Sequence, residues 1–295
     1  MKKVKIIGLT CVGLLLVFSL TNVANAQVPS YVGVNTGDTY IWAATADMAA
    51  VNSTMNGLIG AENWTMVYDM LNGMVENGTG QSIGTFAGVG LKIDVTNMTE
   101  EMPFTIYPFS QIPGVGLYTN MSVAYEPNNW TLLMSGPSFV ILDPTYIAQD
   151  NWHWYLSSYF FHPKGLNYNQ MATWMALNFT NMPPFGAPNM TVTGIGDGIR
   201  FTFLGSFLED MANELSNGSF PITGLSDIVA EAKWNSNGVF SYASVAYGGL
   251  TLATIQLVAG GGNEVPGFVI PLVLGTTVAA MICTIYIIKK KKRIL

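Results

Sequence analysis

Residues 228–258 read IVAEAKWNSNGVFSYASVAYGGLTLATIQLV and form the clearest strand pattern in the chain. It holds three runs rich in β-branched, aromatic and small apolar residues, at 228–234, 239–246 and 250–258. The connections between them, NSNG at 235–238 and a Gly-Gly pair at 248–249, are typical of tight turns between antiparallel strands. The stretch therefore predicts a three-stranded antiparallel meander.

The preceding part of the chain contains further strand patterns and three helical ones. Residues 90–98 alternate between apolar and polar side chains, as expected of a half-buried strand. Other predicted strands lie at 39–44, 104–109, 115–125, 130–134 and 139–142, and in a hairpin of 189–195 with 199–204. Helical patterns occupy 64–75, much of 144–179, and 207–215. Because strands come first and last with helices between them, the chain predicts an α+β fold, a curved antiparallel sheet with helices packed on one face.

The N-terminus has the three parts of a secretory signal. Lys2, Lys3 and Lys5 precede an apolar run at 6–20, and Ala24-Asn25-Ala26 supplies a small-x-small cleavage pattern. We therefore expect a signal peptide at 1–26 and a mature protein that begins at Gln27. A retained first membrane helix is the alternative interpretation.

The C-terminus carries a second hydrophobic segment. An uncharged run from Phe268 to Ile288 is followed by five consecutive basic residues at 289–293. As a helix this run would reach about 31 Å, the thickness of a bilayer's hydrocarbon core. Because basic residues stay on the cytoplasmic side, we expect a transmembrane anchor at 265–288 and a cytoplasmic tail at 289–295. Residues 27–264 would then form one extracytoplasmic domain held at the cell membrane.

This predicted domain, 27–264, is strongly acidic and contains no cysteine. It holds all 18 acidic residues of the chain but only four basic ones, a net charge of −14. A surface this acidic repels nucleic acid, so no nucleic-acid partner is expected. Cys11 and Cys283 both lie in the hydrophobic ends, so no disulfide framework is predicted and stability has to come from a hydrophobic core.

Asparagine-linked glycosylation motifs are more numerous than this composition gives by chance. Nine Asn-x-Ser/Thr triplets without proline at x begin at Asn52, Asn63, Asn77, Asn97, Asn120, Asn129, Asn178, Asn189 and Asn217. Such motifs accept glycans on surface loops of exported proteins. The set predicts a glycoprotein, with an Asn- and Thr-rich polar surface as the alternative for any single motif.

Pro266, Gly267 and Phe268 begin the C-terminal hydrophobic run, which the basic tail ends. This order of motif, helix and basic tail resembles the tripartite C-terminal signals of archaeal cell-surface proteins, and the lysine-rich tail is similar to those of Asgard-type archaea. The resemblance implies a membrane archaeosortase as a partner, which recognises the motif, removes the helix and attaches the protein to lipid. The chain lacks the usual threonine-rich stalk, so a permanent membrane helix is the alternative.

Motifs that carry catalytic chemistry are few. The chain has no Gly-x-Ser-x-Gly elbow, no His-Glu-x-x-His and no Walker loop. Its only histidines, His153 and His162, lie in an aromatic-rich segment where packing is the favoured interpretation. No loop has a calcium-binding pattern, so we expect no enzyme, no metal and no cofactor.

Aromatic side chains are the remaining candidates for a binding site, because they stack on sugars or line apolar clefts. The candidates are Trp152, Trp154, Tyr155, Tyr159 and Trp174. The sequence thus predicts a membrane-anchored, N-glycosylated surface protein with a structural or binding role, whose partners are envelope proteins or glycans. One alternative is a carrier or receptor for an apolar ligand, by analogy with the curved sheet of bacterial lipoprotein carriers. A third hypothesis is a hydrolase that uses His153 or His162 with a carboxylate.

Overall fold

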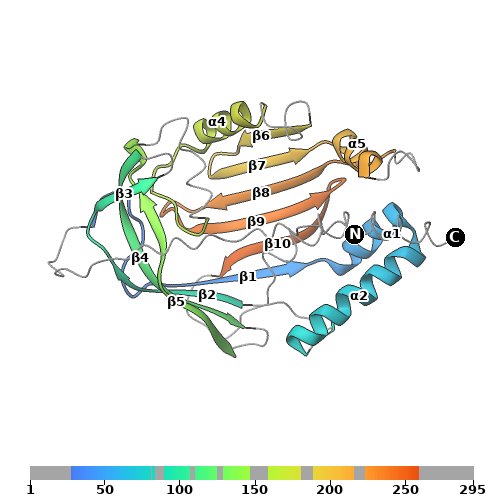
Figure 1. Cartoon of the computed structure of the whole chain (residues 1–295), viewed down its shortest axis with the longest axis horizontal. Helices are drawn as coiled ribbons and strands as arrows, with labels where there is room; N and C mark the ends of the chain where they lie inside the picture. Colours follow the sequence, from blue (N-terminus) through green and yellow to red (C-terminus); the bar gives the residue numbers. More distant parts are fainter. Residues whose placement is uncertain are drawn as a thin grey trace, which may run out of the picture.

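The computed structural model of the chain describes residues 28–80, 82–83, 90–106, 110–124, 129–146, 159–180, 189–215 and 223–258. Within these residues, ten strands form one sheet and four α-helices accompany it (Figure 1). The strands are β1 (Thr39–Ala46), β2 (Gly90–Met98), β3 (Met102–Ile106), β4 (Ser110–Ala124), β5 (Trp130–Leu142), β6 (Met190–Gly194), β7 (Gly198–Phe203), β8 (Ile228–Trp234), β9 (Phe240–Tyr247) and β10 (Leu250–Val258). The helices are α1 (Met48–Ile59), α2 (Ala61–Thr79), α4 (Tyr168–Thr180) and α5 (Gly205–Leu215), with a 3₁₀ turn η1 (Pro144–Tyr146). The predicted combination of an antiparallel sheet with helices is confirmed.

The sheet joins the two ends of the described chain. Its strand order is β3-β4-β2-β1-β10-β9-β8-β7-β6, with β5 paired to β4, and every pairing among these strands is antiparallel. The first strand, β1, lies between β2 and the last strand, β10, so that Ile41 stands opposite Val258. The N-terminal and C-terminal halves of the sheet therefore meet at this one pairing.

The predicted C-terminal meander is confirmed as β8, β9 and β10, within one residue at each strand end. The turn between β8 and β9 is organised by Asn235, whose side-chain oxygen accepts hydrogen bonds from the backbone N–H groups of Asn237 and Val239. Gly238 closes this turn with a φ of +73°, which favours glycine because it has no Cβ. The NSNG sequence thus has a direct local reason for its turn.

Three sequence predictions were wrong in detail. Within the stretch predicted as helical at 144–179, residues 159–162 form no helix, and Phe161 forms an isolated antiparallel bridge with Val239. The strands predicted at 130–134 and 139–142 are one continuous strand, β5, which runs through Gly136 and Pro137. Proline is tolerated there because β5 lies at the edge of the sheet, where among the described strands it pairs only with β4, and its register shifts near these residues. The helix α1 was not predicted at all. It begins at Asp47, whose side chain caps it by accepting a hydrogen bond from Ala50 N–H.

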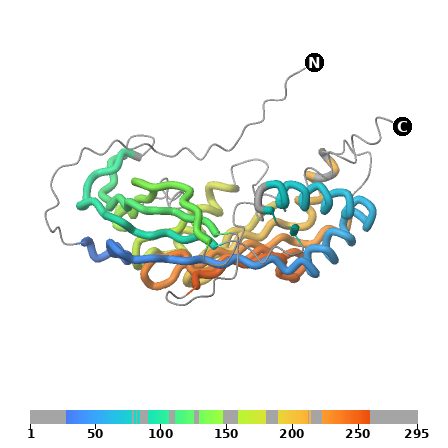
Figure 2. The backbone as a smooth tube through the Cα atoms, turned by 90° about the horizontal axis from the view of Figure 1, so that it is seen from below, coloured from blue at the N-terminus to red at the C-terminus, as the bar shows by residue number. Residues whose placement is uncertain are grey.

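Three separate hydrophobic clusters stabilise the fold. The main cluster holds buried residues of all ten strands together with Phe161 and α4, and includes the fully buried Trp42, Ile93 and Leu117. A second cluster lies where α5 packs on β8 and β9, and a third holds α1 and α2 together. Figure 2 shows β3–β5 and the α1–α2 pair on the same side of β1, at opposite ends of the molecule.

None of the described helices is long and apolar enough to cross a membrane. The predicted signal peptide at 1–26 and the predicted anchor at 265–288 with its Pro266-Gly267-Phe268 motif lie outside the described residues. The basic tail at 289–295 lies outside them as well.

Candidate functional site

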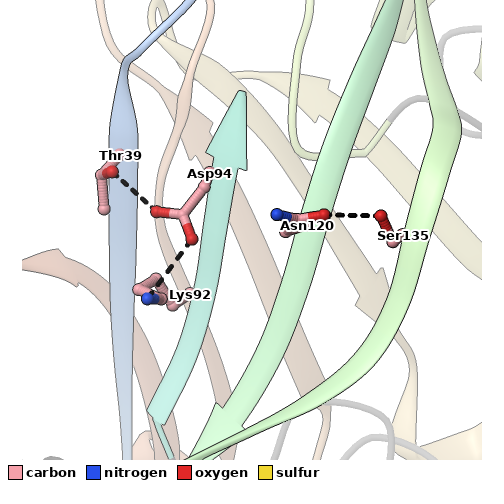
Figure 3. A network of polar contacts seen from close by, with 5 residues as sticks. All are labelled: Thr39, Lys92, Asp94, Asn120 and Ser135. Atoms are coloured by element: carbon pink, nitrogen blue, oxygen red, sulfur yellow. Dashed lines mark hydrogen bonds and ion pairs between the residues drawn. The ribbon is translucent and has the colours of Figure 1, made fainter. Parts of the chain in front are cut away.

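The sheet has two chemically different faces. We call the face that carries Trp42 and Ile93, and that packs into the main cluster, the inner face. The opposite, outer face carries polar side chains across β1, β2, β4 and β5 (Figure 3). On it Thr39 Oγ1 donates a hydrogen bond to Asp94, which also forms an ion pair with Lys92 at 3.3 Å. A binding site for an apolar ligand would therefore lie on the inner face.

The inner face of the central strands is lined mainly by alanine. Two cross-strand rows of side chains point inward over β1, β10, β9 and β8, and six of these eight positions are alanine. One row, continued onto β7, is Ala44, Ile255, Ala243, Ala232 and Ile199. The other is Ala46, Ala253, Val245, Ala230 and Phe201. We call these rows the alanine floor. Because the alanine side chain ends at Cβ, a group that packs on these rows can approach the sheet backbone more closely than it could over leucine or phenylalanine.

The α1–α2 hairpin follows β1 directly and lies next to β10, at one end of this part of the sheet. It leaves the end of β1 at Asp47, whose backbone N–H donates to Leu252 O of β10, and α1 packs against β10. The hairpin has its own small core, in which Met55, Trp64 and Val67 are buried. None of these three residues belongs to the main cluster. The hairpin is therefore held to the sheet at one end but stabilised chiefly by its own packing.

The other end of the inner face is closed by aromatic rings. Trp42 is fully buried, and its indole N–H donates to Phe240 O at 2.7 Å. Its ring contacts Phe160, with ring centres 5.0 Å apart and an edge-to-face orientation. Tyr159, a binding candidate from the sequence, stacks obliquely on Phe240 at 4.6 Å. Burial raises the pKa of the Tyr159 phenol well above its usual range, because the charged form would lose its hydration.

The other aromatic candidates have different positions. Trp174 lies on α4, half-buried, and packs against the main cluster. Its backbone carbonyl accepts a hydrogen bond from the side chain of Asn178. Trp152, Trp154 and Tyr155 lie outside the described residues. Of the five candidates, Tyr159 and Trp174 are thus both part of the packed core around the inner face.

His162 lies in the core. It is fully buried, and its ring stacks on Trp234 with ring centres 4.2 Å apart. Its Nδ1 lies 3.2 Å from the hydroxyl of Tyr168. Burial and, to a smaller extent, the charge of Asp197 raise the pKa of that tyrosine far above its usual range. These contacts make His162 a packing residue out of reach of a substrate. His153 lies outside the described residues.

The described part of the chain holds no group of three or more His, Cys, Asp or Glu side chains that could bind a metal ion. Comparison with models of protein families and with curated proteins finds no match to this chain. The site therefore has to be interpreted from its own geometry.

None of the eight glycosylation-motif asparagines within the described residues is buried. Asn77, Asn97 and Asn129 are exposed, and the half-buried ones are Asn52, Asn63, Asn120, Asn178 and Asn189. Asn217 lies outside the described residues. The side-chain oxygen of Asn120 accepts a hydrogen bond from Ser135 at 2.6 Å, and Figure 3 shows its nitrogen turned toward β2. This orientation leaves the nitrogen, the atom to which a glycan attaches, on the outer face of the sheet.

Sequence reasoning missed the alanine floor because alanine is the least distinctive apolar residue. A signal was nevertheless present. Ala44 and Ala46, and likewise Ala230 and Ala232, occupy alternate positions of one strand, where a core-facing strand usually carries larger residues.

Proposed function

We propose that this chain is a membrane-anchored, N-glycosylated surface protein that holds an apolar ligand, such as an acyl or isoprenoid chain, on the inner face of its curved sheet. The ligand would lie between the alanine floor and the α1–α2 hairpin. The observation that carries this proposal is the end of the alanine floor at Ala46 and Ala253, which belongs to none of the hydrophobic clusters and lies next to a hairpin that has its own core. The protein acts as a carrier or receptor and performs no catalysis.

Two physical arguments support the site. An apolar chain laid on a surface of methyl groups loses its contact with water, which contributes about 25 cal/mol for each Å² of apolar area buried. The hairpin can also be displaced at modest free-energy cost, because Met55, Trp64 and Val67 stay packed against each other when it moves. The main cluster contains none of these three side chains, so it is unaffected by such a movement.

The remaining parts of the proposal rest on the sequence. The run at 268–288 would anchor the domain, either permanently or, if an archaeosortase cuts at Pro266-Gly267-Phe268, through an attached lipid. The exposure of Asn77, Asn97 and Asn129 supports glycosylation, because an enzyme that transfers glycans needs access to the side chain. A hydrolase using His162 is disfavoured by the complete burial of that residue.

A photo-crosslinking experiment tests the ligand site. The full chain is placed in lipid nanodiscs, exposed to a diazirine-bearing fatty acid, irradiated and digested, and the labelled peptides are mapped by mass spectrometry. Labelling is expected on peptides from β1, β10 and the α1–α2 hairpin. Labelling confined to 268–288 would show that the probe meets the chain only within the bilayer, and would contradict the proposal.

Two neighbouring residues of β10 provide a matched pair of variants. Ala253 lies opposite Ala46 on the alanine floor and outside the hydrophobic clusters, whereas Thr254 points to the outer face. Ala253→Leu fills the floor, and overpacking of about 1–3 kcal/mol should reduce labelling by roughly 5- to 150-fold. Thr254→Val keeps the size of the side chain on the other face and should leave labelling unchanged. Equal labelling of the two variants would exclude the floor as the site.

A further inference from the structure

One part of β5 is exposed on both of its faces. Residues 131–135, Thr-Leu-Leu-Met-Ser, are five consecutive exposed residues, and within them Leu132, Leu133 and Met134 are 58%, 57% and 45% exposed. A strand that packs on a hydrophobic layer normally alternates between buried and exposed side chains. This alternation is absent here, so no described element covers either face of residues 131–135. We call these residues the exposed segment of β5.

A β-bulge lies in the middle of the exposed segment. Met134 stands opposite Met121 of β4. The next pair in this ladder is Leu132 with Ser122, so Leu133 has no counterpart on β4. An extra residue of this kind interrupts the regular pairing of a strand and redirects a side chain. The bulge thus helps to present three neighbouring apolar side chains to solvent.

The exposed segment also lies on an open edge of the sheet. Among the described strands β5 pairs only with β4, so the backbone N–H and C=O groups on its other side face no described strand. β5 has 13 residues, whereas β3 and β6, which end the strand order, have five each, and α4 packs against β6. Pro137 has no N–H and limits pairing at one end, which leaves 130–136 open to another strand.

The distribution of charge favours a second copy of this chain as the partner. Residues 129–142 contain no charged side chain, and neither do residues 110–124, which hold the neighbouring strand β4. Residues 27–264 as a whole hold 18 acidic and only four basic residues, so two copies repel each other over most of their surfaces. They can approach through an uncharged surface, and this edge lacks the charged side chains that usually prevent strands from pairing. A strongly charged partner, in contrast, finds no opposite charge on either strand.

We propose that two copies of this chain associate through the exposed segment of β5, with the two β5 edges antiparallel about a twofold axis. In this arrangement the segment faces itself, so the leucines and the methionine of one copy pack against those of the other. Both open β5 edges are then covered, and the association closes as a dimer. The contact is independent of the proposed apolar ligand, because β5 carries no part of the alanine floor.

Multi-angle light scattering tests whether the dimer forms. The full chain is purified in detergent, and the mass of its protein part is measured over a range of concentrations. This mass is expected to rise with concentration to twice the mass of the monomer and no further. A chain that stays monomeric overturns the proposal, and so does a chain that grows beyond a dimer, because a twofold contact closes.

Two exposed leucines provide a matched pair of variants. Leu133→Glu brings a carboxylate from each copy into the contact, and the dissociation constant of the dimer should rise by more than about 100-fold because like charges then face each other. Leu250, at the start of β10, is 53% exposed, and Leu250→Glu adds the same charge on another strand and should leave the dimer unchanged. Circular dichroism of both variants checks that the fold is intact. A dimer retained by Leu133→Glu, or lost equally in both variants, overturns the proposal.

Hydrogen–deuterium exchange distinguishes paired strand edges from a loose apolar contact. The backbone N–H groups of 130–136 should exchange more slowly at concentrations where the dimer predominates than after dilution to the monomer. Peptides from β6, an edge that takes no part in the contact, should exchange at the same rate in both conditions. A dimer in which the exchange of 130–136 does not depend on concentration has no paired edges and overturns the proposal.

Discussion

Thr119 offers a sharp test of how the inner face is packed. It lies on β4, fully buried, opposite Val95 of β2 and Gly136 of β5. Its hydroxyl oxygen has no hydrogen-bond partner within the described part of the chain. A buried hydroxyl that forms no hydrogen bond costs about 1–3 kcal/mol, because it loses its hydration without compensation.

Replacing Thr119 with valine exchanges this hydroxyl for a methyl group of similar size. The penalty disappears and the shape is kept, so the free energy of unfolding should rise by about 1–3 kcal/mol. For a domain of this length each kcal/mol raises the melting temperature by about 2–4 °C, which gives an expected increase of about 2–12 °C. Differential scanning calorimetry of the full chain in detergent measures this change.

Thr45→Val is the control. The hydroxyl of Thr45 lies 2.9 Å from that of Thr254 on the exposed outer face, so its removal should change stability by no more than about 0.5 kcal/mol. A lower melting temperature for Thr119→Val would contradict an unsatisfied hydroxyl at this position. It would show that the hydroxyl does bind a partner in the folded protein, either water or the polar end of a ligand on the inner face.

Three further outcomes are expected. Trp42→Phe removes the indole N–H that donates to Phe240 O. The free energy of unfolding in urea should fall by about 1–3 kcal/mol because the buried carbonyl loses its partner, and further because a cavity is left behind. An unchanged urea midpoint would contradict this. Stability should fall as the pH rises above about 10, because unfolded tyrosines ionise there while the raised pKa keeps Tyr168 protonated in the folded state. Tyr168→Phe should make the loss of stability above about pH 10 less steep. The same pH dependence in the variant and in the unchanged chain would contradict a role for Tyr168. Asn77→Gln should lower the intact mass of the protein by the mass of one glycan. If the mass changes only by the difference between asparagine and glutamine, Asn77 carries no glycan.

Local pattern predicted much of the fold. The alternation in 90–98 and the turn at 235–238 are local features, and both gave strands or turns close to those observed. The pairing of β1 with β10 could not be predicted in this way, because it joins residues more than 200 positions apart and no short-range signal specifies it. The helix α1 was missed because asparagine, serine, threonine and glycine, which disfavour helices, make up nearly half of it.

The candidate site was less predictable than the fold. Aromatic residues were expected to line it, and Tyr159 instead closes one end of the inner face within the packed core. The alanine floor depends on which strands are neighbours, since alanines of four strands form rows only after β1 has paired with β10.

The position of β10 has a consequence for force. This strand is flanked on both sides, by β1 and by β9, and its last residue, Val258, is where the described chain ends. A pull on the chain beyond Val258 would enter β10 along the strand direction. The two ladders would then be loaded in shear, with many hydrogen bonds strained together rather than broken one after another. The pairing that joins the two halves of the sheet thus also makes β10 resistant to being pulled out of the sheet.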